Sequence, residues 1–157
     1  MGAENHMQVF FDAKSVNEGL ARMLVSAFMT AMNPTLDELD DVKTAVSEAV
    51  TNAIIHGYQN DGQQDNKQQE DVQQVELVCD RDGQQLVVTV EDQGIGMEDV
   101  QVAMEPFFTS KPEMERSGMG FSFMEAFMDK VEVLSKPGEG TKVVMWKYIA
   151  KKEECEQ

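Results

Sequence analysis

The segment from Thr35 to Gly57 constrains the fold most, because it carries the signals of a long helix with one buried face. Thr35 and Glu38 have the spacing of a capping box, in which two side chains satisfy free amides of the first helical turn. Apolar residues then recur every three or four positions along one stripe, at Leu39, Val42, Val46, Ala49, Val50 and Ala53. The segment therefore predicts a helix that ends near Gly57 and packs on a sheet.

The other elements follow from the spacing of apolar residues and from the turn residues between them. We expect strands at residues 6–13, 75–79, 86–91, 131–135 and 141–149, and further helices at 15–32, 97–104 and 119–128. The Asp82-Gly83 pair predicts a hairpin. Residues 59–74 are almost all polar and 105–117 hold two prolines, so both are expected to be loops. The pattern predicts an α+β fold, a two-layer sandwich with helices on one face of a mixed, mainly antiparallel sheet.

The length and the charge of the chain limit its function. At 157 residues it fits one domain, which we place at 1–150 with a charged tail at 151–157. The 29 acidic and 13 basic residues give a formal charge of −16, which repels phosphate backbones and argues against direct nucleic-acid binding. The same acidity suits either a basic protein partner or simple solubility. We find neither a membrane-length apolar run nor a secretory signal, so we expect a cytoplasmic protein without membrane contact.

Glu48 and Asn52 stand four residues apart on the long helix and therefore project from one face. Asn52 offers a neutral oxygen to a Mg²⁺ ion that keeps its waters and takes phosphate oxygens. Glu48 can orient an attacking hydroxyl or accept its proton, as phosphoryl transfer requires. Taken alone, the pair also fits a solvated polar edge of a helix.

Two glycine-containing turns complete a candidate nucleotide site. Asp92 ends a strand and precedes Gly94 and Gly96, so an acceptor-only carboxylate stands beside backbone that a flat ring can approach. Such a carboxylate suits the exocyclic amine of adenine. The second turn, residues 117–120, opens a helix and offers free amides to phosphate oxygens. Each turn alone fits an ordinary turn or cap, but all three features occur in order, which favours one shared site.

These residues resemble the GHKL family of ATP-binding domains, which have the Bergerat type of two-layer sandwich. Residues 48–53 are similar to the asparagine box of that family, 92–96 and 118–120 to its glycine boxes, and Gly140-Thr141 to a further element near the adenine. The stretches 47–58, 106–113 and 115–121 resemble one branch more closely, the anti-sigma F factors of spore-forming bacteria. This resemblance covers residues 8–148, and the glutamine-rich 59–74 segment is its main departure.

The resemblance implies an ATP- and Mg²⁺-dependent serine kinase that acts as a homodimer, sequesters a sporulation sigma factor and phosphorylates a small anti-anti-sigma protein. It makes Glu48 the catalytic base, Asn52 the Mg²⁺ ligand and Asp92 the adenine contact. It gives Arg116, in a lid at 109–116, a catalytic role toward the γ-phosphate or the partner, and gives Arg22 a contact with both partners. Both arginines also fit ordinary surface positions. The residues implied to bind the nucleotide are Asn52, Asp92, Gly94, Gly96, Thr109, Lys111, Ser117, Gly118, Met119, Gly120 and Thr141.

Three other interpretations stay open from the sequence. A binding module could use nucleotide only to order its lid, although Glu48 argues for catalysis. The catalytic fragment of a sensor histidine kinase shares the glycine boxes, but the chain has only His6 and His56 and shows no helical hairpin that would present a phosphoacceptor histidine. A general-stress anti-sigma kinase is a near relative, and residues 109–121 favour the sporulation type.

Overall fold

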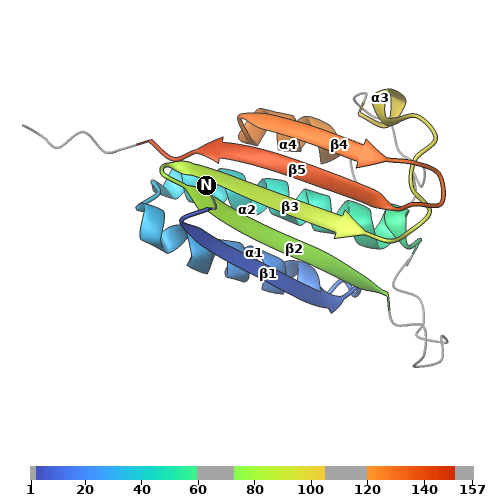
Figure 1. The fold of residues 1–157 in the computed structure, drawn as a ribbon, viewed down its shortest axis with the longest axis horizontal. Helices are drawn as coiled ribbons and strands as arrows, with labels where there is room; N and C mark the ends of the chain where they lie inside the picture. The colour runs from blue at the N-terminus through green and yellow to red at the C-terminus, as the bar shows by residue number, and fades with distance from the viewer. Residues whose placement is uncertain (1–2, 60–72, 105–119, 151–157) are drawn as a thin grey trace, which may run out of the picture.

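The computed structural model describes residues 3–59, 73–104 and 120–150, which form a sheet with helices on one face (Figure 1). Two short helices are not of the α type: η1 (Thr30–Met32) is a 3₁₀ helix and η2 (Ala53–Gly57) is a π helix. This arrangement confirms the predicted α+β class with one sheet layer and one helix layer. In chain order the elements are β1 (Asn5–Asp12), α1 (Asn17–Met29), η1 (Thr30–Met32), α2 (Leu36–Asn52), η2 (Ala53–Gly57), β2 (Gln74–Asp82), β3 (Gln85–Asp92), α3 (Val100–Ala103), α4 (Gly120–Phe127), β4 (Lys130–Ser135) and β5 (Thr141–Tyr148).

The sheet has the strand order β1-β2-β3-β5-β4, and every pairing is antiparallel. Antiparallel pairing lets one face of a sheet be buried while the other meets solvent. Along β3 the side chains of Leu86, Val88 and Val90 are buried, whereas Val87 between two of them is partly exposed. Because side chains alternate between the two faces, Asp92 at the end of β3 continues the buried set.

The helix layer consists mainly of α1, α2 and α4, with α2 between the other two behind the sheet (Figure 1). The predicted capping box is confirmed: Thr35 Oγ1 accepts the N–H of Glu38 at 3.1 Å, and Glu38 accepts the N–H of Thr35 at 2.9 Å. A cap of this kind stabilises a helix by about 1 kcal/mol. The predicted apolar stripe also faces the core, where α2 buries Val42, Ala45, Val46, Ala49 and Val50.

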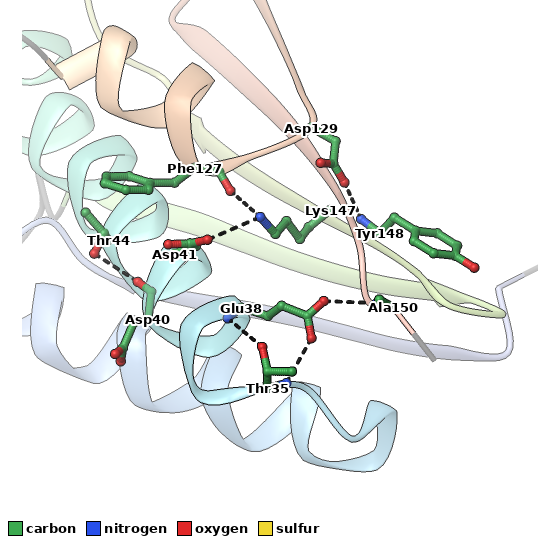
Figure 2. A network of polar contacts seen from close by, with 10 residues as sticks. All are labelled: Thr35, Glu38, Asp40, Asp41, Thr44, Phe127, Asp129, Lys147, Tyr148 and Ala150. Atoms are coloured by element: carbon green, nitrogen blue, oxygen red, sulfur yellow. Dashed lines mark hydrogen bonds and ion pairs between the residues drawn. The ribbon is translucent and has the colours of Figure 1, made fainter. Parts of the chain in front are cut away.

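A polar network fastens the N-terminal end of α2 to the end of β5 (Figure 2). Beyond its capping role, Glu38 accepts the N–H of Ala150 at 2.9 Å. Lys147 donates to the carbonyl oxygen of Phe127 at 2.6 Å and pairs with Asp41 at 3.5 Å, which joins β5, α4 and α2. These contacts hold α2 and α4 against the sheet at the N-terminal end of α2.

Two helices are shorter than the apolar spacing predicts. The helix expected at 15–32 begins at Asn17, and its last turn tightens into η1 before Asn33, whose φ of 52° ends it. The helix expected at 97–104 is reduced to α3, because the side chain of Asp99 accepts the N–H of Val102 and caps a later start. Polar caps and left-handed residues set such boundaries, and hydrophobic periodicity does not detect them.

The hairpin between β2 and β3 turns at Gly83, with a φ of 59°, as the Asp82-Gly83 pair predicts. Most of the two predicted loops and the predicted tail lie outside the described residues, since 60–72, 105–119 and 151–157 are not included. Among the helices that the structure describes, we find none with the length and apolar character needed to cross a membrane.

Candidate functional site

Asp92 is a carboxylate buried at the end of β3, with 3% of its surface exposed. Its Oδ1 accepts the N–H of Gly94 at 2.9 Å, and the amide of Thr141 on β5 also donates to it. Burial raises the pKa of Asp92 to about 6, the two amides lower it in part, and the charge of Glu91 adds to the rise. Within the three described ranges no lysine or arginine pairs with this carboxylate. Since an ionised carboxylate has about four acceptor positions, two amides leave capacity for a donor on a ligand.

Gly57 and Gly94 bring the end of η2 against this carboxylate. A Cβ atom at position 57 would lie 2.6 Å from Cγ of Asp92, and one at position 94 would lie 1.9 Å from the carbonyl oxygen of Gly57. That carbonyl oxygen accepts the N–H of Ile95 at 2.9 Å, which ties the turn after β3 to η2. Both positions therefore require glycine because of the close approach of the backbone.

The loop between β4 and β5 packs against the other side of the turn that follows β3. Gly140 has a φ of 74°, and a Cβ atom there would lie 2.0 Å from the backbone oxygen of Asp92. Gly96 has a φ of 69°, and a Cβ atom there would lie 1.9 Å from the carbonyl oxygen of Lys136. Thr141 is 7% exposed and pairs with Asp92 across the sheet, so both side chains lie on its buried face. The predicted glycine turn, Asp92 and Thr141 are thus brought together.

The predicted metal ligand and the predicted catalytic base both lie near the C-terminal end of α2, which continues through η2 to the turn after β3. Asn52 is the last residue of α2 and is partly buried, as is Glu48 one turn earlier. The helix then widens into the π-helical η2, which ends at Gly57 against Asp92. Such π-helical turns are rare and occur frequently at functional sites. Asn52 and Glu48 therefore lie on the helix whose C-terminal continuation contacts the buried carboxylate of Asp92.

Tyr58 contributes to the site although no sequence pattern gave it a role. Its hydroxyl accepts the N–H of Gln93 at 2.8 Å and donates to the carbonyl oxygen of Gln74 at 2.6 Å. Burial raises the pKa of Tyr58, the amide of Gln93 lowers it in part, and the charge of Asp92 raises it further. Tyr58 therefore holds Gln93, the first residue after Asp92, in place. A tyrosine after Gly57 gives no periodic signal, so only the tertiary contact reveals this function.

Arg22 is separate from this turn and lies on α1. Its Nε is 3.1 Å from Oε1 of Glu18, and the same oxygen accepts the hydroxyl of Ser47 on α2. The guanidinium is partly exposed, which leaves it accessible to another protein. Its predicted partner contact stays a prediction.

Gly120 is the described member of the predicted phosphate-binding turn, and it begins α4, which packs against α2. Its backbone is buried at that helix start. The other residues predicted for the lid and the phosphates lie outside the described residues: Thr109, Lys111, Arg116, Ser117, Gly118 and Met119.

The described groups suit a ligand that donates hydrogen bonds. The Asp92 carboxylate supplies the acceptor, and the glycine backbone packed against it on two sides holds that acceptor in place. An amino-substituted purine has these properties. Asn52 offers one neutral oxygen, which fits Mg²⁺ because that ion usually takes most of its ligands from water and phosphate.

The antiparallel sheet, the helix layer and the glycine-bounded carboxylate define a class of nucleotide-binding domain. Residues 11–147 match the family described as "Histidine kinase-like ATPase domain". Two solved structures share the fold: the RsbU and RsbW domains of a Mycobacterium tuberculosis protein, with TM-score 0.60 and 14% identity, and full-length ShkA in complex with AMPPNP, with TM-score 0.53 and 17% identity. They match 92% and 96% of this chain, which spans 32% and 33% of theirs.

Relatives with higher sequence identity show which family of this ATPase-domain class the chain resembles. Three proteins named "Anti-sigma F factor" come from Clostridium kluyveri (51% identical, 93% of this chain and 96% of the relative), Clostridium perfringens (52%, 93% and 98%) and Oceanobacillus iheyensis (47%, 94% and 95%). The chain belongs to the anti-sigma F factor family. The resemblance seen in the sequence motifs is thereby confirmed.

Proposed function

We propose that this chain is an ATP-dependent serine kinase and anti-sigma factor, which sequesters a sporulation sigma factor and phosphorylates a small anti-anti-sigma protein on serine. The family supports the anti-sigma role, and the ATPase-domain match supports ATP binding. The observation that carries the nucleotide site is the buried Asp92, with unused acceptor capacity and glycine backbone on both sides.

In this proposal each described residue has a physical task. Asp92 accepts a hydrogen bond from the exocyclic amine of adenine, and the glycines around it let the neighbouring segments pack closely enough to hold the carboxylate in place. Asn52 holds Mg²⁺, which neutralises phosphate charge when bound. Glu48, one turn before Asn52, orients the serine hydroxyl of the partner and accepts its proton. Arg116 and the turn at 117–120 keep the phosphate roles that the family resemblance implies.

Charge explains why the phosphorylated partner would leave. A phosphoserine adds about two negative charges, and this chain has a formal charge of −16. A phosphorylated anti-anti-sigma protein therefore binds weakly, and the sigma factor keeps its place. Arg22, whose Nε pairs with Glu18, is the proposed contact for both proteins.

The homodimer is proposed to form through the face of the sheet that the helices leave uncovered (Figure 1). Phe10, Leu134 and Tyr148 alternate with buried neighbours, so they lie on that face, with 56%, 51% and 58% of their surfaces exposed. Val87 and Trp146, paired between β3 and β5 on the same face, are partly exposed, so apolar side chains are spread across this face and favour a protein contact. Sedimentation equilibrium should give the mass of a dimer, and Tyr148→Glu should lower it toward that of a monomer.

The kinase is tested by incubating the purified chain with labelled Mg-ATP and a candidate anti-anti-sigma protein. We expect label on serine. Glu48→Gln should still bind ATP but transfer phosphate about 100-fold or more slowly, since general base catalysis contributes about that much. Glu125→Gln, on the exposed side of α4, is the matched control.

Two other results would contradict this proposal. Label on histidine would indicate the chemistry of a sensor kinase. Normal ATP binding without any transfer, in the presence of a partner that binds the chain, would indicate a nucleotide-gated binding module.

A further inference from the structure

Ser135, the last residue of β4, makes three hydrogen bonds beside the Asp92 turn. Its Oγ accepts the N–H of Met97 at 2.8 Å and donates to the carbonyl oxygen of Gly140 at 2.8 Å. It also lies 2.9 Å from Oγ1 of Thr141, where either hydroxyl could be the donor on geometry alone. The serine therefore connects the two loops that enclose the turn.

The direction of the bond between Ser135 and Thr141 follows from the number of hydrogens. A serine hydroxyl has one hydrogen and two lone pairs. The carbonyl oxygen of Gly140 can only accept, so the single hydrogen of Ser135 points to it. Met97 occupies one lone pair with its N–H, and the second lone pair accepts the hydrogen of Thr141. All the hydrogen-bonding capacity of Ser135 is then in use.

This arrangement determines what Thr141 can offer to a ligand. Its hydroxyl hydrogen is committed to Ser135, and its backbone amide is committed to the carboxylate of Asp92. The oxygen of Thr141 therefore keeps only lone pairs for further contacts. Because Asp92 and Thr141 are paired across the sheet on its buried face, two acceptors stand side by side.

We propose that Ser135 is a positioning residue that keeps the Thr141 oxygen an acceptor toward the ligand, and so makes this site prefer a 6-aminopurine over a 6-oxopurine. An amino group donates to these acceptors, whereas an oxo group at the same position meets them with lone pairs and leaves them unsatisfied. The inference rests on the proposed adenine site and adds the residue that determines its preference.

The test compares the dissociation constants of ADP and inosine diphosphate, whose bases carry an amino and an oxo group at position 6, the oxo base also carrying a hydrogen on N1, by displacement of a fluorescent adenine nucleotide. The unmodified chain should prefer ADP. In Ser135→Ala the hydrogen of Thr141 is released and can turn to an oxo group, so the preference should fall about tenfold, the factor that about 1.4 kcal/mol represents. Ser135→Thr keeps the hydroxyl and should keep the preference. Ser26→Ala is the matched control, because its hydroxyl donates to the carbonyl of Arg22 within α1.

An unchanged preference in folded Ser135→Ala would overturn the inference, as would an equal loss of affinity for both nucleotides, since destabilisation weakens both alike. If Ser135→Ala does not fold, Thr141→Val removes the same acceptor while keeping the shape of the side chain, and it should lower the preference similarly. An unchanged preference there would overturn the inference too. Failure of the unmodified chain to bind ADP would instead overturn the proposed function, and the inference with it.

Discussion

Asp92→Asn should stabilise the protein without nucleotide and weaken nucleotide binding. Asp92 is 3% exposed, and burial raises its pKa from 3.8 to about 6. Each pKa unit corresponds to about 1.4 kcal/mol, so above about pH 7 ionisation destabilises the folded state by about 3 kcal/mol. Asparagine carries no charge, but it keeps only one oxygen for the amides of Gly94 and Thr141 and loses a hydrogen bond of about 1 kcal/mol. The net expectation is a gain of about 2 kcal/mol in the free energy of unfolding at about pH 8.

The pH dependence of this gain has a defined sign. A carboxyl group whose pKa is higher in the folded state stabilises the fold fully below 3.8, and that contribution is lost as the pH rises through about 6. Asparagine does not titrate, so the advantage of Asp92→Asn should grow by about 1.5 kcal/mol from about pH 5 to about pH 8. Urea unfolding followed by fluorescence of Trp146, the single tryptophan, measures it. The other carboxyl groups titrate in both proteins and cancel in the difference.

The same variant should bind ATP about 30-fold more weakly, because it loses a charge-assisted hydrogen bond worth about 2 kcal/mol. Calorimetric titration with Mg-ATP measures this effect. A stability difference that does not change with pH would refute the claim that the carboxylate is ionised against a burial penalty. Unchanged ATP affinity would refute its assignment to adenine.

Three further substitutions test the packing around the site and the cap of α2. Gly57→Ala places a Cβ atom 2.6 Å from Cγ of Asp92, so it should abolish ATP binding in calorimetry or prevent folding; normal binding would contradict the close approach. Tyr58→Phe leaves the amide of Gln93 without its partner and should lower the free energy of urea unfolding by about 1–3 kcal/mol; a change below about 0.5 kcal/mol would count against that bond. Thr35→Ala removes the cap and should lower the unfolding free energy by about 1 kcal/mol with ATP affinity unchanged; weaker ATP binding would show that the two ends of α2 are coupled.

The parts of the fold that the sequence predicts well are those that local signals determine. The stripe and capping box at Thr35 lie within one segment, and the turn at Gly83 is decided by two neighbouring residues. Asp92 is also predictable from the sequence, because a carboxylate before two glycines at the end of a strand is a local pattern. These features need no knowledge of which elements meet in space.

The remaining parts of the site depend on contacts between distant segments. Gly57 belongs to a recognisable motif, yet the reason for glycine is Asp92, which lies on a different element. The π-helical turn that ends at Gly57 has no signal in the apolar spacing. Tyr58 and Ser135 act through hydroxyl bonds to backbone groups of other loops, and neither lies in a pattern that requires a hydroxyl. Tertiary hydrogen bonds of this kind are visible only when the loops are placed together.

The central claim is that nucleotide binds where the end of α2 meets the turn after β3. Amide NMR of the labelled chain during titration with Mg-ADP tests it most directly. The resonances of Gly94, Ile95 and Thr141 should shift, while those of Thr35 and Ala150 at the opposite end of α2 should stay in place. Saturable shifts at that opposite end without shifts at the Asp92 turn would contradict the claim.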